Sequence, residues 1–241
     1  MTTEKGLRYA AHHALPGIGR DGQARIKHSS IALVGLGGLG CATVQYLVSS
    51  GIGRLTLCDF DRVEESNLAR QILYTPSDVG SGKAEAARET LNRLNPECQH
   101  ELVASRVDRD RAGQLAEEHD ICIDASDNYG TRLAVNRSCL ELGKPWVMAS
   151  CIRMEGQIMF MRPDLPEQAC YRCAYGKAPD TLEDCPGAGI FAPVAGIVGA
   201  SAAHFALGHL ADLEPPGGLH LFDAANWQWQ TLTLRKDPDC K

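Results

Sequence analysis

The stretch 31-IALVGLGGLG-40 decides the fold. Its first four residues form an apolar run typical of a buried parallel strand, and the run leads directly into the spacing Gly35-x-Gly37-x-x-Gly40. Apolar side chains at helical spacing follow over residues 41–50. In a strand-turn-helix context the glycines let the backbone approach a phosphate, and the helix N-terminus supplies unpaired N–H groups. The stretch therefore predicts a nucleotide-binding turn in an α/β fold.

Outward from this turn, short apolar strands alternate with helical segments. The expected strands are 55–58, 101–104, 120–124 and 146–149, and the expected helices are 83–94, 110–118, 130–142 and 194–211. This order predicts a Rossmann-like, doubly wound α/β fold with a mostly parallel sheet, extended by late, partly antiparallel strands at 157–161, 219–222 and 230–234. We expect one domain over 1–241, made of an N-terminal arm (1–30), a nucleotide-binding core (31–154) and a second half (155–241).

The composition narrows the classes of function. Of 241 residues, 44% are hydrophobic and 22% charged, which excludes a disordered chain, and the net charge of −6 argues against a nucleic-acid partner. The start of the chain lacks the apolar core of a signal peptide, and histidines interrupt the apolar stretch 193–211, which predicts a buried helix and no membrane span. Ten cysteines without a secretory signal favour a reducing, cytoplasmic location.

Charged residues after the turn indicate which nucleotide binds. Asp59 comes nineteen residues after Gly40, at the end of the next strand, where an acid can accept hydrogen bonds from ribose hydroxyls. The turn and Asp59 alone do not separate NAD from ATP. Arg70 and Lys83 favour ATP, because transfer at a polyphosphate needs cations that hold the departing charge. Asp127 follows a later strand at the same sheet edge and is a candidate Mg²⁺ ligand.

Further motifs continue in order along nearly the whole chain. They are Arg8-Tyr9, Leu15-Pro16, Cys41 after the glycine turn, Asp59-Phe60-Asp61, Ser66-Asn67-Leu68, Arg70-Gln71, Gly82-Lys83, Leu94-Asn95-Pro96, Asp127-Asn128, 152-IRMEGQ-157, Cys170-x-x-Cys173 and 237-DPDC-240. With these motifs the sequence resembles the ThiF/MoeB/HesA family, relatives of the ubiquitin-activating enzymes.

The resemblance implies an activity and partners. Family members bind ATP with Mg²⁺ and the C-terminal Gly-Gly tail of a small ubiquitin-like sulfur-carrier protein, adenylate the terminal carboxylate and release pyrophosphate. Sulfur then reaches the acyl-adenylate from a cysteine desulfurase or rhodanese-type donor, for thiamine or molybdopterin synthesis. The resemblance also implies a homodimer. The motifs do not separate the two pathways. Residues 153–157 resemble the molybdopterin branch more, whereas residues 221–223 and Trp229 resemble the thiamine branch more.

Carried over to this sequence, the family pattern gives each matching residue a role. Gly38 would contact the nucleotide phosphates and Asp59 the ribose; Asn67, Arg70 and Lys83 would hold the phosphates and the developing charge; Asp127 would organise the metal, with Asn128 beside it. A carboxylate attacks the α-phosphate without a general base, so positioning and charge neutralisation would carry catalysis.

One motif departs from the family. Its members commonly have Arg-Tyr-x-Arg near the start, with the second Arg thought to reach ATP in the neighbouring subunit, whereas this chain has Ala11 at that position, followed by His12. Either His12 or another cation substitutes, or adenylation is slower, or the chain is a specialised paralogue. Two alternatives therefore stay open: an NAD-linked oxidoreductase, supported only by the glycine turn and Asp59, and a non-catalytic member that only binds a ubiquitin-like partner.

The cysteines outside the expected core suggest two further functions. Cys170-x-x-Cys173 reads as half of a structural zinc site, with a redox pair as the alternative, and the family pattern adds Cys240 as a third ligand. The family closes with a second CxxC motif, whereas this sequence ends at Lys241, which leaves the fourth ligand unassigned. Cys185 lies in a Pro/Gly-rich loop, where an aligned Cys bonds covalently to the carrier in some relatives and is dispensable in others.

Overall fold

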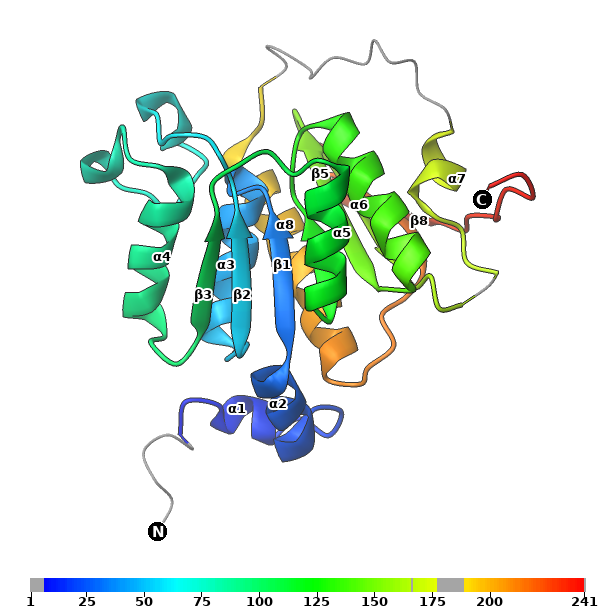
Figure 1. The fold of residues 1–241 in the computed structure, drawn as a ribbon, viewed down its shortest axis with the longest axis horizontal. Helices are drawn as coiled ribbons and strands as arrows, with labels where there is room; N and C mark the ends of the chain where they lie inside the picture. Colours follow the sequence, from blue (N-terminus) through cyan, green and yellow to red (C-terminus); the bar gives the residue numbers. More distant parts are fainter. Residues whose placement is uncertain (1–6, 166, 177–188, 241) are drawn as a thin grey trace.

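The computed structural model describes residues 7–165, 167–176 and 189–240, which form a sheet covered by helices on both faces (Figure 1). Its strand order is β3-β2-β1-β4-β5-β6-β7-β8. The strands are β1 (Ser30–Val34), β2 (Arg54–Cys58), β3 (Gln99–Val103), β4 (Ile121–Asp124), β5 (Trp146–Ile152), β6 (Glu155–Met161), β7 (Gly218–Asp223) and β8 (Gln228–Leu232). Each expected strand is present, with bounds shifted by up to three residues.

The pairing of neighbouring strands changes once along the sheet, from parallel to antiparallel, between β5 and β6. Strands β1 to β5 pair in parallel, and β6, β7 and β8 are added as antiparallel neighbours. The predicted doubly wound sheet with late antiparallel strands is therefore confirmed. A hairpin turn joins β5 to β6, and Arg153 in that turn has a φ of 54°.

Helices cover both faces of the sheet and enclose two apolar cores. The helices are α1 (Ala10–His13), α2 (Gly19–His28), α3 (Gly38–Ser49), α4 (Lys83–Leu94), α5 (Arg109–Glu118), α6 (Tyr129–Leu142), α7 (Tyr171–Tyr175) and α8 (Ala192–Leu210), with short 3-10 turns η2 (Glu65–Asn67) and η3 (Pro76–Asp78). Side chains of α3, α4 and α8 fill one core, and those of α5, α6 and α7 fill the other. Ile31 and Leu33 face the first core, and Ala32 and Val34 face the second, so both faces of β1 are apolar.

The apolar helix α8 is a core element. Among the described residues it alone is long and apolar enough to cross a membrane, and more than half of it is buried. It packs against α3 and against strands β5 and β6. This packing agrees with the expected buried helix.

The N-terminal arm contains two helices that the sequence pattern did not reveal. Helix α2 carries two glycines and only one buried apolar side chain, Ile26, so the sequence there has no run of spaced apolar residues. Buried Gln23 instead connects it to the rest of the chain by donating to the carbonyl of Ser50 (2.8 Å). Figure 1 shows α1 and α2 beyond the amino ends of the parallel strands.

Close packing of α3 and α8 depends on a glycine. An ideal Cβ on Gly199 would lie 2.5 Å from the carbonyl oxygen of Leu39 and 2.9 Å from the Cβ of Ala42. The Thr43 Oγ1 also lies 2.9 Å from the Gly199 carbonyl oxygen. Because α3 starts at the glycine turn, this contact holds the turn's helix in place.

Gly199→Ala should separate α3 from α8 and lower the free energy of unfolding by about 1–3 kcal/mol, as overpacked cores do. Gly196→Ala in the same helix is the matched control, because no atom lies within 4 Å of an ideal Cβ there. The free energy of unfolding of the control should rise by up to about 1 kcal/mol, because alanine has a higher helix propensity than glycine. Urea unfolding of both variants measures the difference; equal stability of the two would contradict the close contact.

Candidate functional site

The candidate site lies at the carboxyl edge of the parallel strands, between β1 and β4. The strand order reverses there, and open α/β sheets bind ligands in the crevice at such a reversal. Gly35 leaves β1 with a φ of 93°. Ala125 leaves β4, and its N–H donates to the carbonyl of Val34 at 2.8 Å. The glycine turn and the 124–128 loop therefore lie against each other.

The glycines of the turn divide into two kinds. An ideal Cβ on Gly35 would lie 2.8 Å from the Ala125 carbonyl oxygen, and one on Gly40 would lie 2.0 Å from the Gly35 carbonyl oxygen. Gly35 and Gly40 are therefore required by the packing of the chain itself. An ideal Cβ on Gly37 would meet nothing nearer than 3.9 Å, so the space beside Gly37 is open. Gly38 is intermediate, because an ideal Cβ on it would lie 3.2 Å from the Cβ of Ala195.

The N-terminus of α3 faces this site without a side-chain cap. The helix begins at Gly38, and its N-cap residue is Gly37. Uncapped N–H groups and the helix dipole together suit an anion.

Asp59 fixes the shape of the turn. Its Oδ2 accepts a hydrogen bond from the Leu36 N–H (2.7 Å), and its Oδ1 accepts one from the Asp61 N–H (2.9 Å). Burial raises the pKa of Asp59 above its ordinary value, while the Lys83 ammonium and these two N–H groups oppose the rise. Each carboxylate oxygen keeps a further acceptor position, which a ribose hydroxyl could use.

The two predicted basic residues both lie next to the turn. The Lys83 side chain is only 8% exposed, and its Nζ lies 2.9 Å from the Asp61 Oδ2. The Arg70 Nη1 donates to the carbonyl of Ser66 at 3.2 Å, and an ideal Cβ on Gly38 would lie 3.5 Å from the Arg70 Cγ. The structure therefore brings both cations to the place where an anion would bind.

The loop after β4 carries one exposed and one buried carboxylate. Asp127 is exposed at the sheet edge. Asp124 is fully buried, and its Oδ1 accepts from the Ser126 N–H (2.8 Å), while its Oδ2 has no hydrogen-bond partner among the described residues. Burial raises the pKa of Asp124, against the attraction of the Arg132 guanidinium. The Asn128 Oδ1 accepts from the Thr131 N–H (2.9 Å), so this residue caps α6.

Sequence reasoning missed two residues that support the site. The Tyr74 hydroxyl donates to the carbonyl of Leu36 (3.0 Å) within the glycine turn. The Arg132 Nη2 donates to the carbonyl of Ser126 (2.6 Å) and to the Ser150 Oγ (3.2 Å), which ties the loop to β5. Neither residue stands at a spacing that a motif could reveal.

The predicted phosphate ligand Asn67 is buried at the end of η2. Its Nδ2 donates to the Ser66 Oγ at 3.3 Å. Its carbonyl accepts from the N–H groups of Arg70 and Gln71, at 3.0 and 2.9 Å. In this structure Asn67 therefore orders the segment that carries Arg70.

The family motif near the start of the chain lies far from this edge. The Arg8 Nη1 donates to the carbonyl of Leu94 (3.1 Å), and the Tyr9 hydroxyl accepts from the Asn95 Nδ2 (3.1 Å). The His12 Nδ1 lies 2.7 Å from the Gln23 Oε1. These contacts belong to the arm below the amino ends of the strands (Figure 1). His12 therefore does not replace the missing arginine at this chain's own site.

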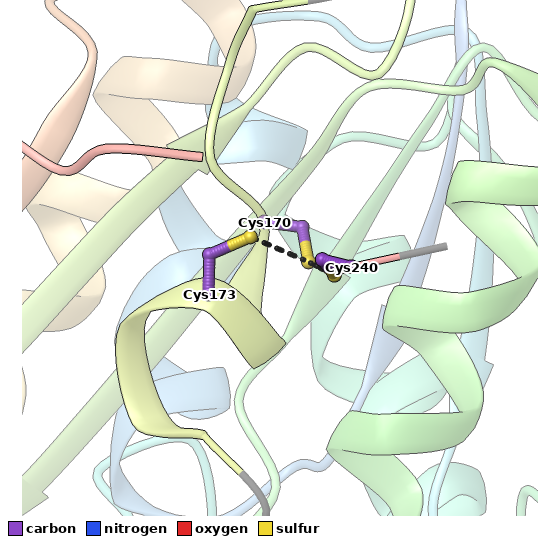
Figure 2. Close-up of side chains that lie close together, drawn as sticks. All are labelled: Cys170, Cys173 and Cys240. Carbon is purple, nitrogen blue, oxygen red and sulfur yellow. Dashed lines mark hydrogen bonds between the residues drawn. The ribbon is translucent and has the colours of Figure 1, made fainter. Parts of the chain in front are cut away.

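Three of the predicted metal ligands meet at a second place. Figure 2 shows the thiols of Cys170, Cys173 and Cys240 directed towards one another. Their sulfurs lie within 4.8 Å of one another, with 3.4 Å between Cys170 and Cys240. Burial opposes ionisation of Cys173, but hydrogen bonds from the N–H groups of Asp237 and Cys170 lower its pKa overall. Three converging thiols fit a zinc ion. The other candidate cysteine, Cys185, lies outside the described residues.

The chain is similar to known proteins over nearly its whole length. The ThiF family model matches residues 9–241. A sulfur carrier protein adenylyltransferase of Thermus thermophilus is 39% identical over 246 residues, covering 99% of this chain and 91% of that protein. A molybdopterin-synthase adenylyltransferase of Escherichia coli is 38% identical, covering 100% and 97%. The crystal structure of E. coli MccB with MccA-N7isoASN has a TM-score of 0.86 at 24% identity, covering 97% of this chain and 74% of MccB, which shows a shared fold.

Gly37→Ala tests whether a phosphate occupies the open space. An alanine at this position meets no protein atom nearer than 3.9 Å, so the free energy of unfolding should not change. If a phosphate lies there, the added methyl group should weaken ATP binding about tenfold, equivalent to roughly 1.4 kcal/mol. Equilibrium dialysis with ATP provides the measurement. Unchanged affinity in the folded variant would place the phosphates elsewhere.

Proposed function

The chain belongs to the ThiF family, and from this membership we propose that it adenylates the C-terminal glycine carboxylate of a small ubiquitin-like sulfur-carrier protein. The observation that carries the proposal is the open space beside Gly37 at an uncapped helix N-terminus, with Arg70 and Lys83 next to it. This arrangement suits a polyphosphate.

In the proposed reaction a carboxylate oxygen of the carrier forms a bond to the α-phosphorus of ATP. The bond from that phosphorus to the bridging oxygen breaks, and pyrophosphate leaves with the electron pair. The carboxylate is ionised at neutral pH, so no general base is required. The protein contributes positioning and stabilisation of negative charge.

We assign the roles within the site as follows. Gly35, Gly37, Gly38 and Gly40 form the phosphate turn, Asp59 binds the ribose, and Asn67, Arg70 and Lys83 hold the phosphates. Lys83 and Arg70 are the residues that stabilise the departing pyrophosphate, and Asn128 positions the loop that carries Asp127.

Two metal ions fit the residues present. The exposed carboxylate of Asp127, at the edge where the triphosphate would lie, suits Mg²⁺, which commonly takes one or two carboxylates together with phosphate oxygens. A magnesium ion there would supply charge neutralisation to the polyphosphate. Cys170, Cys173 and Cys240 would hold Zn²⁺, which would tie the C-terminal segment to α7.

The wider organisation follows the family resemblance. We propose that residues 31–154 handle the nucleotide and residues 155–241 hold the carrier and zinc, in a cytoplasmic homodimer. Cys185 and a cysteine desulfurase or rhodanese-type donor are candidates for the later sulfur transfer. Thiamine and molybdopterin synthesis both remain as pathways. Neither an NAD-linked oxidoreductase nor a non-catalytic binding protein is favoured, because the relatives are named as adenylyltransferases.

Lys83→Met should abolish most of the activity. The loss of one cation that stabilises the leaving pyrophosphate should lower the rate of carrier-dependent pyrophosphate–ATP exchange by about 10²–10³-fold. Each Gly-Gly-ended carrier of the same cell is added in turn, which also identifies the pathway.

Arg88→Ala is the control for this experiment, because Arg88 is an exposed cation on the same helix. Its exchange rate should stay within about twofold of the parent rate. A parent protein that binds ATP and gives no exchange with any carrier would refute the proposed function.

Cys173→Ser should remove the zinc. The parent chain should carry about one zinc ion, measured by mass spectrometry of metals after gel filtration, and the variant should lose most of it because one of three thiolate ligands is gone. Cys151→Ser is the control, since Cys151 lies outside the thiol cluster. Full zinc content in the Cys173 variant would exclude this site.

A further inference from the structure

An aromatic ring and a guanidinium stack at the sheet edge outside the groups already described. Phe60 directly follows Asp59 at the end of β2 and is 52% exposed. The Arg106 Cζ, from the segment after β3, lies 5.1 Å from the centroid of the Phe60 ring. In the described part of the chain, Arg106 forms no ion pair with a carboxylate, and the Phe60 ring is its described contact.

The pair is held in a fixed relation to the glycine turn. The Asp59 N–H donates to the carbonyl of Val103 (3.1 Å), which joins the end of β2 to the end of β3. The Asp59 carboxylate in turn accepts from the N–H of Leu36 inside the turn. Moving outward along the sheet edge, the order is therefore the glycine turn, Asp59, and then the Phe60–Arg106 pair.

This order matches the order of parts in a nucleotide. With the phosphates at the glycine turn and the ribose at Asp59, the base extends over the ends of β2 and β3, where the pair lies. A guanidinium is planar and stacks on aromatic faces, and nucleobases stack on both groups. An exposed phenyl ring gains such a flat partner in addition to the guanidinium.

We propose that Arg106 and Phe60 form a stacking platform for the base of ATP, and that Arg106 determines the preference for a purine. The proposal rests on the proposed function of the nucleotide site. A purine offers a larger face to the guanidinium than a pyrimidine does. In this arrangement Arg106 lies at the base and away from the reacting carboxylate, so it would act on the affinity for the nucleotide.

Arg106→Ala provides the main test. The KM for ATP in pyrophosphate exchange should rise about three- to tenfold with kcat nearly unchanged, because stacking holds the base equally in the ground and transition states. The preference for ATP over CTP should fall by a similar factor. Arg106→Lys keeps the charge and loses the planar group, so it should behave like the alanine variant.

Arg109→Ala is the matched control. Arg109 is an exposed arginine three residues after Arg106, and it forms an ion pair with Glu141 on α6. It should leave the KM for ATP and the choice of base unchanged. Adenosine, which has no phosphate, is the decisive probe in a direct binding measurement. If Arg106 stacks on the base, the Arg106→Ala variant should bind adenosine and ATP more weakly than the parent protein, by the same factor for both.

Three results would overturn the proposal. One is an unchanged KM for ATP in Arg106→Ala. Another is weakened ATP binding with unchanged adenosine binding, which would assign Arg106 to the phosphates. The third is a raised KM for the carrier alone. The binding arm needs no turnover, so it tests the platform even if exchange with every carrier fails and the proposed function with it.

Discussion

The structure depends on one close contact, the approach of the glycine turn to the loop after β4. Neither Gly35 nor Gly40 has room for a Cβ, because the atoms they would strike are backbone atoms of Ala125 and of the turn itself. Backbone cannot move aside as a flexible side chain can. The segments that leave β1 and β4 are therefore held against each other, with the N-terminus of α3 at the same edge of the sheet, where open α/β sheets bind ligands. The second close contact, of Gly199 on Leu39, holds the other side of α3.

The sequence predicted the parts of the fold that a simple pattern encodes. Helix α4 was predicted with its observed bounds, because alanines recur on its buried face and Asn95-Pro96 ends it. Helix α2 was missed, because its stability comes from Gln23 and Ile26 packing onto distant residues and only one of these is apolar. Local periodicity carries no record of such long-range polar contacts.

In the site, too, the residues marked by a local sequence pattern were predicted, and those that act through long-range polar contacts were not. Asp59, Arg70 and Lys83 were predicted for the site from their positions after the turn, and the structure places all three near it; their roles stay predictions. Tyr74 and Arg132 were not found, because each acts through a hydrogen bond to a backbone carbonyl, at Leu36 and Ser126. Any residue type has such a carbonyl, so no motif marks the partner.

The balance of charge at the site bears on how a triphosphate is accommodated. Lys83 is already paired with Asp61, and Asp59 and Asp127 lie at the same edge, so these carboxylates offset part of the positive charge of Arg70 and Lys83. The N-terminal arm adds no positive charge to the site of the same chain through His12, because His12 contacts Gln23 at the opposite end of the strands. A triphosphate would thus gain less attraction from Arg70 and Lys83 than two unpaired cations would give. The uncapped N–H groups of α3 compensate in part, and a divalent cation bound with the nucleotide at Asp127 would supply the rest. The proposed adenylation should therefore depend more steeply on magnesium than a site with the additional arginine would.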